Sequence, residues 1–161
     1  MKLKTLAAVF ALSSGALFAQ TVDVKDAWAR ATVPGQKATG AFMKLTAKEG
    51  TKLVAISSPV AGVGEVHEMK MEGDVMKMRA VTGGLDLPAG KAVELKPGGY
   101  HVMLMDLKST LQKDTTIALT LVFKDAKGVE TKTELTLPVS MTPPGAKAAD
   151  MPAMDHSKHK M

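Results

Sequence analysis

Four residues with soft or nitrogen donor atoms lie in the middle of the chain: His67, Met78, His101 and Met103. Two imidazoles and two thioethers form a neutral ligand set. Such a set favours Cu(I), which is soft, over Zn(II), which prefers thiolate, imidazole and carboxylate. The sequence contains no Cys, so a blue-copper electron-transfer centre, which requires a thiolate, is excluded. The donor types therefore predict a Cu(I) site.

The first two of these residues belong to a predicted β-hairpin. Two strand-like runs flank residues 72–74, and we place the centre of the turn at the peptide bond before Gly73. Gly73 then occupies the second loop position, which suits a turn that needs positive φ. In this register His67 faces Met78 directly, with Cβ atoms about 5 Å apart. The pair could share one metal ion.

His101 and Met103 supply the second half of the predicted site. They are two residues apart in a strand-like run, so they project from the same face. If this strand lies near the open end of the hairpin, all four ligands converge. The remaining methionines nearby are most simply interpreted as core packing, and the alternative is a second shell that shields copper from water and oxygen: Met69, Met71, Met76 and Met105.

Composition and the N-terminus place the protein outside the cytoplasm. The chain has 12 Met against four Phe, one Tyr and one Trp, an excess that thioether ligation would explain. Lys2 and Lys4 precede an apolar stretch over residues 6–18 that is too short to span a bilayer, which needs about 20 residues. We expect residues 1–19 to be a signal peptide cleaved near Ala19, with no stable membrane anchor and a periplasmic destination. Removal of the signal with Lys2 and Lys4 would lower the net charge from +5 to +3, and a charge this small and dispersed does not favour nucleic acid.

After the signal, short runs with strand-like composition follow one another at intervals near ten residues, separated by Gly or Pro. No later stretch sustains helical apolar spacing, although residues 46–51 and 107–113 could each hold a helical turn. The pattern predicts an antiparallel β-sandwich or barrel over residues 20–140. Residues 141–161 are polar and poor in apolar side chains, which predicts a flexible tail. The predicted strands are residues 23–29, 41–47, 52–56, 66–71, 75–81, 85–87, 92–95, 100–107, 115–123 and 131–139.

The spacing His67-x10-Met78-x22-His101-x-Met103 resembles the signature of the periplasmic PCu(A)C copper chaperones. The resemblance extends over residues 22–140 and includes blocks at 26–42, 75–79 and 95–105. It implies a cupredoxin-like Greek-key β-barrel, copper as the cargo, and the same four ligands. It also implies delivery of Cu(I) to a copper protein, such as the subunit that carries the binuclear copper centre of cytochrome oxidase. Glu68 stands where some members have Met, which leaves Glu68 outside the ligand set.

The C-terminal segment resembles Met- and His-rich extensions of some family members. Its imidazoles, together with Asp155, are harder ligands than thioethers and could take Cu(II), whereas its methionines could take Cu(I). The alternative is a solubilising end. Tyr100 is a further candidate for shielding the site, although loop packing is the simpler interpretation. The candidate tail ligands are Met151, Met154, His156, His159 and Met161.

Two other functions use the same residues differently. A periplasmic copper buffer without a dedicated target would have the same ligands, and a β-sandwich interaction module would bind no stoichiometric copper. We expect no enzyme, because the sequence shows no nucleophile–base arrangement and no acidic pair at a plausible site. The expected form is a monomer that transfers copper to a receiving protein or to another periplasmic chaperone.

Overall fold

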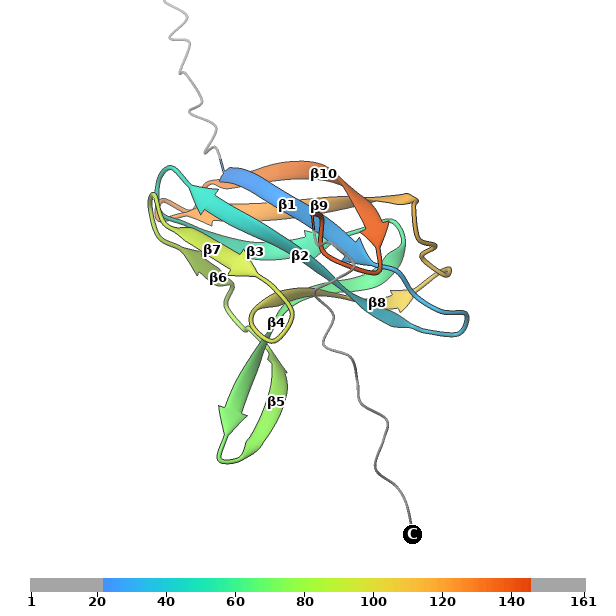
Figure 1. Cartoon of the computed structure of the whole chain (residues 1–161). Coiled ribbons are helices and arrows are strands. Elements are labelled where there is room, and N and C mark those ends of the chain that lie inside the picture. The colour runs from blue at the N-terminus through green and yellow to red at the C-terminus, as the bar shows by residue number, and fades with distance from the viewer. Residues whose placement is uncertain (1–21, 146–161) are drawn as a thin grey trace, which may run out of the picture.

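The computed structural model describes residues 22–145, which form ten strands and no helix (Figure 1). Within that range no helix is therefore long and apolar enough to cross a membrane. The predicted signal peptide and the ligands of the predicted tail lie outside the described residues. The strands are β1 (Val22–Arg30), β2 (Ala38–Ala47), β3 (Thr51–Ser57), β4 (Ala61–Glu72), β5 (Val75–Ala80), β6 (Leu85–Leu87), β7 (Ala92–Leu95), β8 (His101–Leu107), β9 (Thr116–Asp125) and β10 (Glu130–Ser140).

Seven strands close into a barrel, in the order β4-β8-β2-β1-β10-β9-β3 and back to β4. The closing seam between β3 and β4 is narrow, with Ile56 opposite Gly64. All pairings are antiparallel except β1 with β10, where Ala29 lies beside Val139. β5, β6 and β7 lie outside this ring and pair with β4, β3 and β2 respectively. The all-β, cupredoxin-like barrel expected from the sequence is confirmed.

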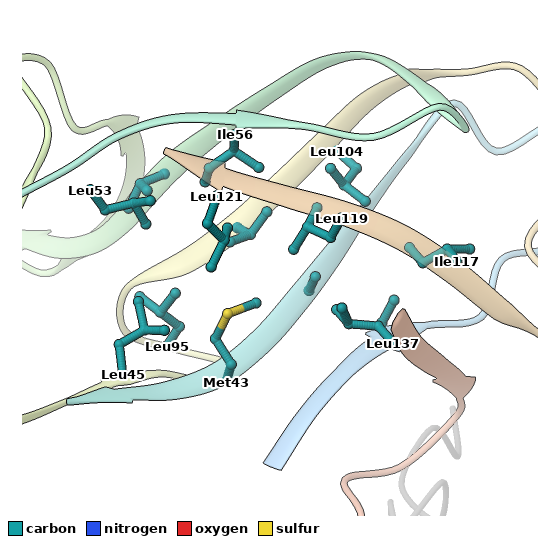
Figure 2. Packing of buried hydrophobic residues seen from close by; sticks show 14 of the residues in the cluster. Met43, Leu45, Leu53, Ile56, Leu95, Leu104, Ile117, Leu119, Leu121 and Leu137 are labelled. Atoms are coloured by element: carbon teal, nitrogen blue, oxygen red, sulfur yellow. The ribbon is translucent and has the colours of Figure 1, made fainter. Parts of the chain in front are cut away.

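The inside of the barrel is filled by alternate residues of its strands (Figure 2). Along β9, for example, Ile117, Leu119, Leu121 and Phe123 are buried while their neighbours are more exposed. This two-residue period is what a strand with one face on a core requires. Met43 is part of the same core, so one methionine in the chain does serve as packing.

The hairpin of β4 and β5 has a different register from the one predicted. Met69 faces Met78 and Met71 faces Met76, while His67 faces Ala80. The turn consists of Gly73 and Asp74, with Gly73 in the first central position at φ 64°. Positive φ at that position is the pattern of a type II′ turn, so the predicted centre was one residue early. The pairing therefore shifts by two residues, and the methionines keep the same face.

This hairpin extends away from the barrel (Figure 1). All six residues of β5 are exposed, and beyond His67 the strand β4 pairs only with β5. Core packing was the simpler interpretation for Met71 and Met76, and it is wrong for both, because their side chains are 54% and 49% exposed. Met69 and Met105 are partly buried.

Candidate metal centre

Both predicted histidines lie where β4 leaves the barrel. His67 is paired on one side with His101 of β8 and on the other with Ala80 of β5. It is thus the last residue of β4 that belongs to the barrel wall and the first of the projecting hairpin. The two imidazole centroids are 6.0 Å apart, with their planes inclined by 54°.

The histidines face outward from the barrel wall. Their neighbours Val66, Val102 and Leu104 are part of the buried core. Because side chains alternate along a strand, His67, His101 and Met103 project from the opposite face. The candidate centre is therefore on the outer side of the barrel wall, where neighbouring groups still cover both histidines, which are 9% (His67) and 7% (His101) exposed.

A tight turn orients the ring of His101. Pro97 and Gly98 occupy the centre of the turn from Lys96 to Gly99, with Gly98 at φ 82° and the Gly99 N–H donating to the Lys96 carbonyl. Pro followed by Gly at positive φ is the pattern of a type II turn. The Gly99 carbonyl accepts the His101 Nδ1–H at 3.1 Å and the Met69 backbone N–H at 3.2 Å. With Nδ1 used as a donor, the lone pair of His101 is left on Nε2.

His67 is oriented by a carboxylate in its own strand. Its Nε2 lies 2.8 Å from Oε2 of Glu65, which is two residues earlier and therefore on the same face. With Nε2–H donating to Glu65, the lone pair is on Nδ1. That Nδ1 is buried and has no hydrogen-bond partner. A buried polar atom without a partner costs free energy, and metal coordination is one way to satisfy it.

A row of rings crosses the barrel wall at this level. Trp28 of β1 lies 4.8 Å from Phe42 of β2, and Phe42 lies 6.5 Å from His101. The Phe42 ring lies back over Gly40, where a Cβ would be only 2.8 Å from it, so this position needs Gly. The Arg30 guanidinium lies over the other part of Phe42, 5.4 Å from its centroid. The row provides a rigid apolar wall next to the histidines.

The thioethers gather in a groove of about 310 Å³ on this outer face. Met103 of β8, Met78 of β5 and Met69 of β4 line it together with His101. His67 is not part of the lining but packs beside His101 at the inner end. Three of the four predicted ligands, Met78, His101 and Met103, therefore line one groove. The fourth, His67, lies next to the groove, with its ring centroid 6.0 Å from that of His101. We call this space the outer groove.

The donors present fit a soft cation. Among residues 22–145 no group of three His, Cys, Asp or Glu side chains is placed to hold a metal ion. The thioethers of Met69, Met78 and Met103 line the same groove as His101, and thioether and imidazole are donor types that suit Cu(I) better than Mg²⁺. Each imidazole has its second nitrogen fixed by a hydrogen bond, as expected for metal ligands.

The sequence analysis did not identify the two groups that orient the histidines, the Glu65 carboxylate and the Gly99 carbonyl. Glu65 carried a signal, because a carboxylate two residues from a histidine in a strand shares its face. The Gly99 carbonyl carried none, because a backbone group has no residue type of its own. Glu68 pairs with Arg79 at 2.7 Å on the other face of the hairpin, in agreement with its exclusion from the ligand set.

The other candidate residues lie around the groove rather than in it. Met105 follows Met103 on the same face of β8 and pairs with Ala38. Met76 lies on the hairpin opposite Met71. Tyr100 lines a different pocket, with Val81 and Val93, so the structure does not bring it to the groove. Their shielding role stays a prediction.

The closed all-β barrel, with a groove lined by histidine and methionine on its outer face, belongs to the cupredoxin-like fold class. The chain itself belongs to the LpqE-like family, described as "Putative lipoprotein LpqE-like", whose model matches residues 22–139. A relative from Leifsonia xyli subsp. xyli, "Putative lipoprotein Lxx21020", is 34% identical over 107 residues. That match covers 66% of this chain and 64% of the relative's length.

The solved structures of similar fold include copper-bound proteins. The copper-bound PCuAC domain from PmoF2 has a TM-score of 0.58 at 21% identity, with 77% of this chain and 96% of that chain covered. Cu(I)-bound DR1885 from Deinococcus radiodurans has a TM-score of 0.56 at 27% identity, with 81% and 83% covered. Its apo form has a TM-score of 0.54 at 28% identity, with 88% and 95% covered.

Proposed function

We propose that this protein is an exported copper chaperone that binds Cu(I) through His67, Met78, His101 and Met103. The observation that carries the proposal is the buried, unpartnered Nδ1 of His67, whose ring lies 6.0 Å from that of His101. Thioethers in the outer groove supply the soft donors that complete a Cu(I) shell. The Cu(I)-bound relative of the same fold supports the choice of metal.

Transfer to a partner follows from the position of the groove. Met78 is 49% exposed, so an incoming ligand can replace its sulfur without unfolding the barrel. Neutral thioethers bind weakly, and a partner that offers thiolates would draw the ion away. The receiving protein in this proposal is the copper subunit of a respiratory oxidase or another periplasmic chaperone. The role is binding and transfer, without catalysis.

The test is an anaerobic Cu(I) titration against a competing chelator. We expect one tight equivalent for the full chain and a loss of affinity in M78L/M103L. The loss should exceed the ten- to hundredfold typical of removing an outer-shell partner. M141L changes an exposed methionine beyond the last strand and is the matched control. Unchanged Cu(I) affinity in M78L/M103L would rule out the ligand assignment.

A periplasmic copper buffer with the same site is the second candidate function. The exposure of Met78 is equally compatible with a chaperone and with a buffer. A deletion strain separates them. A chaperone predicts reduced oxidase activity at low copper, whereas a buffer predicts normal oxidase activity and poor growth at high copper.

Substituting His156 and His159 in the full chain tests whether the predicted tail adds Cu(II) binding.

A further inference from the structure

The projecting hairpin presents four methionines on one face. Met69, Met71, Met76 and Met78 all lie on the side of the hairpin that carries His67, because the two-residue period continues along both strands. We call these four residues the methionine ladder. Its two rungs are the directly opposed pairs Met69–Met78 and Met71–Met76.

Within residues 22–145, the outer rung, Met71 and Met76, is not buried against any other strand. Met71 is 54% and Met76 49% exposed on a hairpin that stands clear of the barrel. Large apolar side chains left about half exposed to water forgo much of the stabilisation that burial would contribute. Opposed residues in a hairpin have Cβ atoms about 4.5–5.5 Å apart, so the two sulfur atoms can reach one ion.

The reverse face of the hairpin is polar. Cross-strand ion pairs join Arg79 to Glu68 and Lys77 to Glu72, each at 2.7 Å. The hydrogen bond from Arg79 to Glu68 raises the pKa of the guanidinium above its ordinary value. These pairs hold the two strands in register and keep charged groups off the methionine face. The hairpin is therefore amphipathic without a core to pack against.

We propose that Met71 and Met76 form an accessory Cu(I) site at the end of the methionine ladder. Successive rungs are two residues apart, about 6.5–7 Å along the strands. An ion bound between Met71 and Met76 can therefore pass to Met69 and Met78, and from there into the outer groove, while it stays in contact with thioether sulfur. The metal remains Cu(I) throughout. The inference rests on the proposed function, because the groove is the destination of the ladder.

Methionine methyl spectroscopy tests this proposal. The full chain is labelled with ¹³C at the methionine methyl groups and titrated with Cu(I) without oxygen, each signal being assigned from a single Met→Leu variant. We expect the signals of Met78 and Met103 to shift with the first equivalent, and those of Met71 and Met76 to shift on further addition. In M71L/M76L the later event should be lost while first-equivalent binding is kept. Leu retains the apolar volume, and M141L is the control.

The outcomes separate the two proposals. Shifts at Met78 and Met103 with none at Met71 and Met76 would overturn the accessory site and leave the proposed function intact. Shifts at Met71 and Met76 with none at Met78 and Met103 would overturn the ligand assignment of the groove and support a hairpin site alone. An absence of shifts at all four would overturn both.

Discussion

At the scale of single residues, the centre depends on two imidazoles held in opposite tautomers. The hydrogen bond to Glu65 leaves the lone pair of His67 on Nδ1, and the hydrogen bond to the Gly99 carbonyl leaves that of His101 on Nε2. Each ring thus has one nitrogen in a hydrogen bond and the other nitrogen outside it, where a metal could bind. Rings fixed in this way lose little rotational freedom when the ion binds.

Removing the carboxylate tests this arrangement. We expect Glu65→Ala to weaken Cu(I) binding by about ten- to a hundredfold, because the tautomer and orientation of His67 are then no longer fixed. Glu65→Gln keeps an oxygen acceptor and should lose less. Competition titration gives the two affinities, and thermal unfolding checks that both variants fold. Equal affinity of Glu65→Ala and the unmodified chain would show that Glu65 has no positioning role.

The ligand types could be predicted from the sequence, but their surroundings could not. His and Met at strand spacing identify a face and a soft metal by chemistry alone. The partner of each imidazole depends on which strands become neighbours, and that is decided by the closure of the barrel. The exposure of Met71 and Met76 was missed for the same reason, because nothing local shows that a hairpin continues beyond the core.

At the scale of elements, the seam between β3 and β4 closes the barrel on the strand that carries His67. Ile56 faces Gly64 there, and a Cβ on Gly64 would lie 2.8 Å from the Ile56 carbonyl oxygen. The close approach requires Gly at this position. The sequence prediction began this strand at Val66 and missed residues 61–65, because the glycines in that stretch are poor strand formers by composition.

Substituting the seam glycine should open the barrel. We expect Gly64→Ala to lower the free energy of unfolding by about 1–3 kcal/mol, because the added methyl group overpacks a backbone contact. Gly50→Ala is the matched control, since a Cβ there meets open space, and it should change stability by less than about 0.5 kcal/mol. Urea denaturation measures both. Equal stability of the two variants would show that the β3–β4 seam has room for a methyl group at position 64.

The pairing of β4 with β5 shows which errors in a predicted register move side chains to the other face of a strand. The pairing differed from the expected one by two residues, and a shift by an even number leaves every side chain on its original face. The residues predicted to share a face therefore still share it, although the centre of the turn was predicted one residue early. A shift by one residue would have put the methionines beside the Glu68–Arg79 pair instead.

At the scale of the whole molecule, the described part of the protein consists of a closed barrel and a hairpin, β4–β5, that extends from it. The barrel holds the imidazoles and the ring row in fixed positions, because its strands are tied on both sides. The hairpin is tied at its base only, where the Met69 N–H donates to the Gly99 carbonyl. Of the four proposed ligands, the barrel wall therefore carries His67, His101 and Met103, and the exposed hairpin carries Met78.

The row of rings across the barrel wall has an optical consequence. Trp28 is the single tryptophan of the chain and is 3% exposed. The ring of Phe42 lies 4.8 Å from that of Trp28 and 6.5 Å from that of His101. We expect one equivalent of copper to quench the fluorescence of Trp28, because a nearby metal ion opens a non-radiative path for the excited indole. M78L/M103L should shift the quenching to higher copper, and emission unchanged at full loading would contradict the placement of the metal beside His101. If copper quenches the emission as expected, the fluorescence of Trp28 reports the copper occupancy of the protein without an added dye.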